Sequence, residues 1–285
     1  MVDQLILPAP AKLNLFLHVT GQRPDGYHQL QTIFQFIDLA DELHFSKLEQ
    51  PELELTGDLA GVRPEHNLIS KAFRLLQQKT GCQLGAKIDC QKNLPIGGGV
   101  GGGSSDAATT LVALNHLWGC GLSSSELQQL GLELGADVPI FIYGHAAWAE
   151  GVGEEFVSVE PPESCYLLLQ PNVLVETTKI FTDPGLTRNS SPIKMGAYSA
   201  ETTRNDLQST VCRLYPEVKS ALEWLGQYGP ARMTGSGSVV FMACEDNQQA
   251  IALAKSVPNR YKAYVCRGCN ISPLQAAIYW GVAKR

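Results

Sequence analysis

Apolar and polar residues alternate near the start of the chain. From residue 11 to residue 19 the odd positions are apolar, and the even positions hold Lys12, Asn14, Phe16 and His18. A period of two is typical of a half-buried β-strand. Lys12 and Asn14 therefore share one face of the predicted strand. That face either points into a cleft or is the solvated face of an edge strand.

Patterns further along the chain predict both helices and strands. A turn at residues 24–26 precedes a second apolar stretch over residues 30–39. Helical spacing of apolar residues predicts helices over residues 67–78, 107–118, 127–134, 216–228 and 248–256. Short apolar runs predict strands over residues 86–90, 166–169, 239–243 and 261–265. Residues 183–204 are polar and irregular, so we expect a long surface loop there.

The ends of two predicted helices carry recognisable signals. Ser104 or Ser105 is a good N-cap for the helix over residues 107–118, and Gly119 is a plausible end. Asp106 is expected to be a first-turn acid that matches the helix dipole. A capping box at residues 123–126 opens the next helix, which we expect to stop at Gly135.

Length and composition describe a folded chain with room for two domains. The chain has 285 residues, of which 44% are hydrophobic and 18% are charged. Glu160-Pro161-Pro162-Glu163 resembles a linker, which suggests one domain over residues 1–162 and another over residues 163–285. The net charge of −6 argues against nucleic acid or an anionic membrane as a partner. No signal peptide or membrane-spanning run is visible, so we expect a cytoplasmic protein.

The eight cysteines are expected to be reduced thiols, because no secretory signal accompanies them. Cys266 and Cys269 form the one Cys-x-x-Cys pair. Structural zinc would need a second pair of ligands, and no other closely spaced Cys/His pair is present. We therefore interpret this pair as incidental.

Six glycines occupy the seven positions from Gly97 to Gly103, between Pro95-Ile96 and Ser104-Ser105. Ordering so many glycines is costly in backbone entropy, so the run needs a reason. Backbone N–H groups without neighbouring Cβ atoms can curl around an anion and contact it directly. The helix predicted to follow adds free N–H groups and a favourable dipole. The pattern predicts a phosphate-binding loop.

Three common nucleotide-binding motifs explain this loop poorly. A Walker A loop needs a Gly-Lys dipeptide, and the chain has none. The dinucleotide pattern Gly-x-Gly-x-x-Gly fits, but in such a glycine-dense run the match is nearly automatic, and no ribose-binding acid follows about 20 residues later. A protein kinase would also need His-Arg-Asp and Asp-Phe-Gly motifs, which are absent.

Four segments in order resemble the motifs of the GHMP kinase superfamily, which includes galactokinase and the homoserine, mevalonate and phosphomevalonate kinases. They are residues 8–15 (PAPAKLNL), residues 95–108 (PIGGGVGGGSSDAA), residues 134–139 (LGADVP) and residues 232–237 (RMTGSG). The lengthened triple-glycine form, together with residues 23–28 (RPDGYH), is similar to one branch. That branch phosphorylates 4-diphosphocytidyl-2-C-methyl-D-erythritol in the non-mevalonate isoprenoid pathway.

The resemblance implies a two-domain α+β fold. Its N-terminal domain would be like domain 2 of ribosomal protein S5, its C-terminal domain would be ferredoxin-like, and the active site would lie in the cleft between them. The implied reaction transfers the γ-phosphate of ATP to the 2-hydroxyl of 4-(cytidine 5′-diphospho)-2-C-methyl-D-erythritol. Another GHMP kinase acting on a different small alcohol, and a non-catalytic nucleotide-binding regulator, are the alternatives.

The resemblance also implies roles for individual residues. Lys12 would stabilise developing negative charge and polarise the acceptor hydroxyl, and Asp137 would be the general base. The simpler interpretation of Asp137 is an N-cap ahead of a first-turn proline. Tyr27 would stack on the cytosine and His28 would hydrogen-bond to its edge, although an aromatic packed beside a hairpin is the plain alternative. The remaining substrate-binding candidates are Asn14 and Phe181, of which Phe181 could equally be a core residue.

The nucleotide side of the site follows from the same resemblance. The expected ATP-binding residues are Asn67, Lys92, Pro95, Ile96, Gly97, Gly98, Gly99, Val100, Gly101, Gly102, Gly103, Ser104 and Ser105. Gly235 to Gly237 would close over the phosphates or merely turn a hairpin. Mg²⁺ is expected to accompany ATP, either with Ser105 as a ligand or held mainly by phosphates and water. Only small molecules are expected as partners, and the sequence leaves the oligomeric state open.

Overall fold

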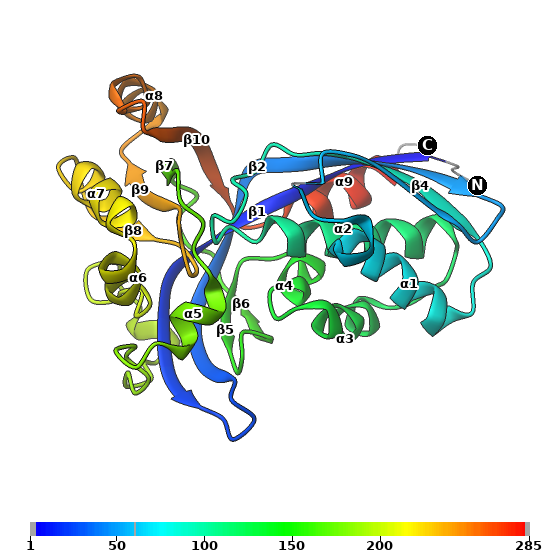
Figure 1. The fold of residues 1–285 in the computed structure, drawn as a ribbon, viewed down its shortest axis with the longest axis horizontal. Helices are drawn as coiled ribbons and strands as arrows, with labels where there is room; N and C mark the ends of the chain where they lie inside the picture. The colour runs from blue at the N-terminus through cyan, green and yellow to red at the C-terminus, as the bar shows by residue number, and fades with distance from the viewer. Residues whose placement is uncertain (1–3, 60, 283–285) are drawn as a thin grey trace.

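A long antiparallel ribbon of two strands runs through both lobes of the molecule (Figure 1). The structure, a computed structural model, describes residues 4–59 and 61–282. Strand β1 (Gln4–Gln22) pairs along its length with β2 (His28–Leu48), and the turn between them includes Gly26 in a left-handed conformation. The predicted strand over residues 11–19 and the predicted turn are both confirmed. Each strand is longer than its apolar pattern suggested.

The remaining strands extend this ribbon on both sides. Their order is β3-β4-β2-β10-β7-β9-β8, while β1 and β5 also pair with β2, and β6 pairs with β5. The bounds are β3 Leu53–Gly57, β4 Gly85–Gln91, β5 Ala147–Glu150, β6 Glu155–Ser158, β7 Cys165–Pro171, β8 Ala231–Met233, β9 Val240–Cys244 and β10 Tyr261–Cys269. The four short strands predicted from apolar runs correspond to β4, β7, β9 and β10.

Helices divide between the two lobes. The first lobe holds α1 (Leu68–Thr80), α2 (Gly102–Leu117), α3 (Ser124–Leu134) and α4 (Val138–Tyr143), which cover one face of its sheet (Figure 1). The second holds α5 (Thr177–Thr182), α6 (Gln208–Leu214), α7 (Pro216–Leu225) and α8 (Asn247–Ser256). Short 3₁₀ turns occupy Pro64–His66 and Met195–Ala197. No described helix has the length and apolarity that a membrane span requires.

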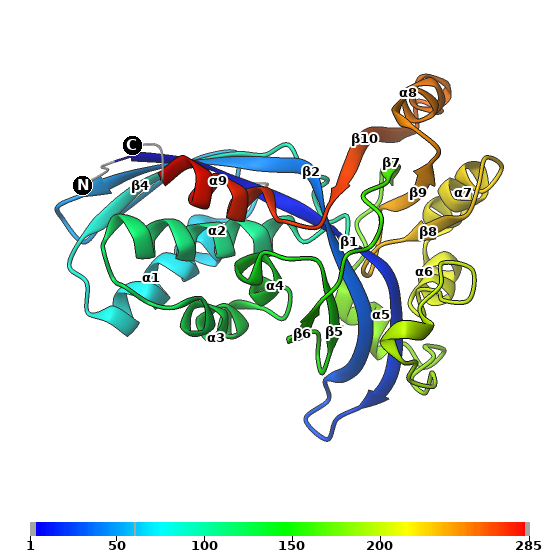
Figure 2. The same ribbon diagram turned by 180° about the vertical axis from the view of Figure 1, so that it is seen from behind.

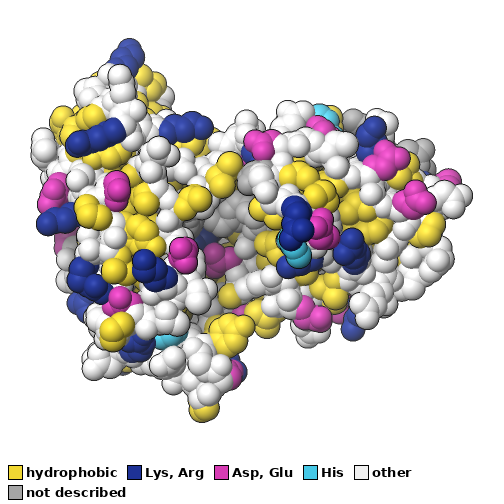
Figure 3. Space-filling model, in the orientation of Figure 1, with side chains coloured by type: hydrophobic (Ala, Val, Ile, Leu, Met, Phe, Trp, Pro, Cys, Tyr) yellow, Lys and Arg dark blue, Asp and Glu magenta, His cyan; other side chains and the backbone are white. Residues whose placement is uncertain are grey.

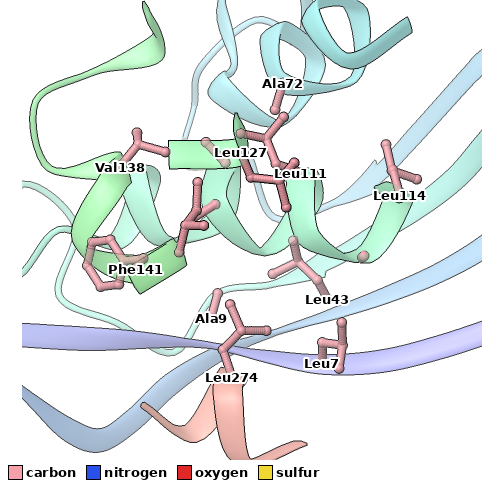
Figure 4. Close-up of a cluster of buried hydrophobic side chains, with 14 of the residues drawn as sticks. Leu7, Ala9, Leu43, Ala72, Leu111, Leu114, Leu127, Val138, Phe141 and Leu274 are labelled. Carbon is pink, nitrogen blue, oxygen red and sulfur yellow. The ribbon is translucent and has the colours of Figure 1, made fainter. Parts of the chain in front are cut away.

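The last helix returns to the first lobe. Helix α9 (Pro273–Val282) lies beside β1 and β2 (Figure 2), and its Leu274 belongs to the buried cluster that contains Leu7, Ala9 and Phe141 (Figure 4). A second buried cluster holds the other lobe together, and a third joins β1 to β7, β9 and β10. The ribbon thus contributes residues to all three of these clusters. The domain boundary expected at residue 162 stays a prediction.

The helix signals were partly right. Ser123 and Glu126 form the predicted capping box, and Gly135 directly follows the end of α3. Gly119 follows Trp118, the C-cap of α2, and has a positive φ of 65°. The predicted N-cap at Ser104 or Ser105 was wrong, because α2 already begins at Gly102 with Gly101 as its N-cap. Asp106 therefore lies beyond the first turn, and its expected role there was also wrong. The glycines allow the helix to start earlier than side-chain capping would indicate.

The half-buried character predicted for β1 was also wrong, since both of its faces are buried from Ala11 to Val19. Ala11, Leu13 and Leu15 pack in the third cluster, while Lys12 and Asn14 lie under the glycine loop. A strand between two lobes has no solvated face. The edge-strand alternative for Lys12 and Asn14 is thereby excluded.

Candidate active site

A cavity of about 1210 Å³ lies between the two lobes, where Figure 3 shows the surface hollowed. Most of the predicted site residues line it: Lys12, Asn14, Tyr27, His28, Asn67, Lys92, Pro95, Ile96, Gly97 to Gly103, Ser104, Asp137 and Phe181. Ser105 does not, because it is fully buried beneath the loop, where its Oγ has no hydrogen-bond partner among the described residues. Residues far apart in the chain therefore line the same cavity.

The glycine loop leads directly into helix α2. Gly99 and Gly101 have positive φ angles of 75° and 80°. A Cβ atom at Gly99 would lie 2.5 Å from the Thr234 carbonyl oxygen, and one at Gly101 would lie 2.7 Å from the Phe141 ring. Both positions thus exclude side chains by conformation and by space. The first intrahelical hydrogen bond comes from the Ser105 N–H to the Gly101 carbonyl, so the preceding N–H groups of the helix remain available to an anion.

The glycine motif of the second lobe is attached to this loop. The backbone N–H groups of Ser238 and Val239 donate to the carbonyls of Gly97 and Gly98, at 3.3 and 3.1 Å. Asn205 supports the same turn from below, because its amide donates to the Gly235 carbonyl at 2.8 Å. Gly235 to Gly237 line the cavity. The two glycine motifs therefore form one continuous wall.

Lys12 and Asp137 form the charged centre of the cavity. The Lys12 ammonium lies 3.3 Å from the Asp137 carboxylate and donates to Asn14 Oδ1 at 2.7 Å and to the Gly99 carbonyl at 3.2 Å. Lys12 is 2% exposed, whereas the Asp137 side chain is 40% exposed. The buried ammonium also lies 5.2 Å from the centre of the Phe34 ring. A fixed cation and an accessible carboxylate thus stand together beside the loop.

Asp137 occupies the N-cap position of α4 and Pro139 lies in its first turn, as the simpler interpretation expected. Its side chain nevertheless makes no capping hydrogen bond. The carboxylate instead faces Lys12. The position at the helix start therefore orients Asp137 toward the cavity rather than toward its own helix.

A second lysine on the cavity wall has a different environment. Lys92 forms ion pairs with Asp41 and, at 2.8 Å, with Asp106, and all three side chains are buried. Asp41 also accepts the backbone N–H groups of Asn93 and Leu94, which lead into the glycine loop. Sequence patterns did not identify Asp41 as part of the site. Asp41 is one of three acids over residues 38–42, and their spacing does not reveal which of them meets a cation.

These buried charges shift one another's ionisation. Burial alone would lower the pKa of Lys92, but the carboxylates of Asp106 and Asp41 together raise it. Burial raises the pKa of Asp106 to about 7, and the nearby Lys92 opposes that rise only in part. Asp106 Oδ1 has no hydrogen-bond partner among the described residues. Two carboxylates therefore compete for one buried cation.

Aromatic residues gather at the opposite end of the cavity. The Tyr27 side chain is 62% exposed at the end of the β1–β2 turn. His28 is buried, and its ring centre lies 5.0 Å from that of Phe181. Phe181 both lines the cavity and packs against the second cluster, so its two interpretations are compatible. Burial and the nearby Arg188 charge lower the pKa of His28.

Arg188 is a cavity residue that the sequence did not reveal. It lies in the irregular segment predicted over residues 183–204, and its Nε–H donates to His28 Nε2 at 3.1 Å. A single arginine in a polar loop carries no pattern that would single it out. Only the folded loop brings it to the cavity.

Among the described residues, neither the possible metal ligands nor the cysteines are arranged for metal binding or disulfide formation. The described residues contain no group of three or more His, Cys, Asp or Glu side chains arranged to hold a metal ion. Ser105 does not line the cavity, so its donor atom does not fit a metal that reaches ATP there. All eight cysteines are free thiols, as expected, and burial raises the pKa of both Cys266 and Cys269.

The fold and both lobes of the chain match known kinases. The family model for the N-terminal domain of GHMP kinases matches residues 67–145, and the model for their C-terminal domain matches residues 186–263. The mevalonate kinase of Methanococcus jannaschii has the same fold, with a TM-score of 0.68 at 15% identity over 94% of this chain and 99% of that one. The chain belongs to the GHMP kinases, and the predicted two-domain α+β fold is confirmed.

Sequence similarity narrows this class. A 4-diphosphocytidyl-2-C-methyl-D-erythritol kinase of Pseudomonas syringae pv. syringae is 54% identical over 271 residues, which are 95% of this chain and 96% of the relative. A crystal structure of 4-(cytidine 5′-diphospho)-2C-methyl-D-erythritol kinase matches with a TM-score of 0.81 at 31% identity, over 93% of this chain and 99% of that one. Within the GHMP kinases, the chain is therefore a member of the 4-diphosphocytidyl-2-C-methyl-D-erythritol kinase family. It is an ATP-dependent enzyme with small-molecule substrates.

Proposed function

We propose that this enzyme transfers the γ-phosphate of ATP to the 2-hydroxyl of 4-diphosphocytidyl-2-C-methyl-D-erythritol, which yields the 2-phosphate and ADP. The observation that carries the proposal is the Lys12–Asp137 pair, 3.3 Å apart, beside the glycine loop of a single cavity. Family membership supports the choice of substrate. The cavity is large enough to hold parts of two substrates, as transfer between them requires.

The glycine loop and the start of α2 hold the ATP phosphates through backbone N–H groups. The residues that contact ATP are Pro95, Ile96, Gly97 to Gly103 and Ser104, with Asn67 and Lys92 on the adenosine side. Asn67 is also the N-cap of α1, through Oδ1, which accepts the Ile69 N–H at 2.9 Å. Its position at the cavity edge is therefore fixed. Ser105 supports the loop from within and does not contact the nucleotide.

Asp137 is the general base, and Lys12 stabilises the charge that develops on the transferred phosphoryl group. The Asp137 carboxylate accepts the proton of the 2-hydroxyl, whose oxygen attacks the γ-phosphorus as the bond from that phosphorus to the β–γ bridging oxygen breaks. Asn14 holds the Lys12 ammonium through its 2.7 Å hydrogen bond and faces the acceptor alcohol. Lys12 is preorganised because it is buried and anchored to the loop.

The aromatic end of the cavity binds the pyrimidine. Tyr27 stacks on the base, Phe181 forms the opposite wall, and His28 hydrogen-bonds to its edge. Magnesium would neutralise charge on the ATP phosphates. Because the described residues include no cluster of His, Cys, Asp or Glu side chains arranged to hold a metal ion, we assign magnesium to phosphates and water.

An ATP-consumption assay over a panel of alcohols tests the proposal. The panel contains 4-diphosphocytidyl-2-C-methyl-D-erythritol, mevalonate and homoserine, and phosphorus NMR identifies the position phosphorylated. We expect turnover with the cytidine compound and a phosphomonoester at its 2-position. Turnover with mevalonate or homoserine alone would refute the substrate, and no turnover with any alcohol would favour a nucleotide-binding regulator.

A further inference from the structure

Arg188 is held by the loop from which it comes. Its Nη2 donates to the carbonyls of Phe181 and Asp183, both at 2.8 Å, and its Nη1 donates to the Leu186 carbonyl at 3.2 Å. These three backbone acceptors fix the plane of the guanidinium. The fourth contact runs from Nε–H to His28 Nε2 at 3.1 Å, and its direction is therefore set by the loop.

The chemistry of this contact determines where the His28 proton lies. An arginine guanidinium is a donor without acceptor capacity and stays protonated in proteins. His28 Nε2 must then accept with its lone pair, which requires the proton of the neutral ring to be on Nδ1. Burial and the Arg188 charge also favour the neutral ring, since both lower the pKa of His28.

The proposal builds on the proposed function, in which His28 meets the pyrimidine edge. We propose that Arg188 is a positioning residue that sets the preference for cytosine over uracil, by holding His28 in the tautomer that donates from Nδ1. The two bases differ at N3, which is a bare lone pair in cytosine and an N–H in uracil, and at position 4, which is an amino group in cytosine and a carbonyl oxygen in uracil. A ring that meets N3 and can only donate there matches cytosine and opposes uracil.

Removal of Arg188 releases this constraint. The neutral ring can then carry its proton on Nε2, which leaves a lone pair on Nδ1 that accepts the N3–H of uracil. In the molecules that carry the proton on Nε2, cytosine loses the Nδ1–H donor that matches its N3. The selectivity between the two bases should therefore fall, even though Arg188 itself need not touch the base.

The test compares kcat/KM for the cytidine substrate and for its uridine analogue. In Arg188→Met we expect the cytidine-to-uridine ratio to fall by about 10-fold or more. Arg213→Met is the matched control, because Arg213 holds the same loop through Asp183, at 2.5 Å, without contacting His28. The ratio should stay at the wild-type value in that variant. An Arg188→Met ratio within about 2-fold of wild type would overturn the proposal.

A spectroscopic measurement covers the case in which Arg188→Met fails to fold. Long-range ¹H–¹⁵N correlations of the wild-type His28 ring should show a protonated Nδ1 and a bare Nε2, and a protonated Nε2 would overturn the proposal without any variant. Wild-type protein inactive toward both substrates would instead refute the proposed function. Active wild-type protein with an unchanged ratio in Arg188→Met would refute only the role of Arg188.

Discussion

Two lysines line the same cavity with opposite arrangements of charge. Lys12 faces one carboxylate, that of Asp137, which is 40% exposed. Lys92 lies between two carboxylates, those of Asp41 and Asp106, and both are buried. In the first pair one positive charge meets one negative charge, and the carboxylate is open to a ligand. In the second group one positive charge meets two negative charges, and all three side chains are buried.

The difference separates the proposed reacting pair from a group that supports the fold. Asp137 can exchange partners, because the cavity reaches its carboxylate and no capping bond restrains it. Lys92 is committed to two acids, one of which also fixes the backbone ahead of the glycine loop. Removing a partner from a buried ion pair is strongly destabilising, whereas a partly exposed pair contributes little to stability. A lysine–aspartate pair can thus be suited either to catalysis or to stabilising the fold, depending on its burial.

The largest expected effect is on catalysis in Asp137→Asn. Asparagine keeps the shape of the side chain but cannot accept the hydroxyl proton, so kcat should fall by about 10²–10⁴-fold. The KM for ATP and the free energy of unfolding should change little, since Asp137 is partly exposed. Single-turnover rates and urea denaturation provide these quantities. A kcat close to wild type would remove Asp137 as the base.

Lys92→Met should differ from Asp137→Asn by a large loss of stability. It leaves Asp41 and Asp106 buried without their cation, so the free energy of unfolding should fall by about 3–5 kcal/mol. Lys71→Met is the control, because Lys71 is exposed on α1, and its stability should stay close to wild type. Urea denaturation measures both variants. Equal stability of the two would show that the buried carboxylates do not depend on Lys92.

Sequence patterns indicated the Lys12–Asp137 pair, whose catalytic role is proposed, better than the buried group of Lys92, Asp41 and Asp106. Alternation in β1 placed Lys12 and Asn14 on one face, and the glycine run indicated a phosphate loop, because both depend on local periodicity and backbone freedom. Asp41 and Lys92 are 51 residues apart in the chain, and their contact exists only because β2 pairs with β4. Arg188 reaches His28 across 160 residues from an irregular loop. Such pairings follow from tertiary structure, which no local pattern encodes.

The buried group should also make stability depend on pH through Asp106. Its pKa is raised in the folded state to about 7, so the folded protein binds this proton more tightly than the unfolded chain. The resulting stabilisation is complete below the ordinary pKa of an aspartate and is lost as the pH rises through about 7. Asp106→Asn cannot titrate there. Between about pH 5 and about pH 8, wild type should therefore lose roughly 1–3 kcal/mol more stability than Asp106→Asn.

Urea denaturation of both proteins at several pH values isolates this contribution, because the other titrating groups are shared and cancel in the difference. Parallel pH profiles for wild type and Asp106→Asn would mean that Asp106 is ionised throughout and that Lys92 satisfies both carboxylates. In that case the surroundings of Lys12 and Lys92 would differ in solvent exposure but not in whether their carboxylates are ionised.

The smallest effect tests the cavity without altering either lysine. Tyr27 lies at the aromatic end and is 62% exposed, so Tyr27→Ala should leave folding intact. Loss of a stacked base costs about 1–3 kcal/mol, which should raise the KM for the cytidine substrate by roughly 10-fold or more. The KM for ATP should not change, because the glycine loop and both lysines keep their contacts. Steady-state kinetics with each substrate varied in turn measures the two values, and an equal rise in both would contradict a stacking role and point to a disturbance that reaches the phosphate end.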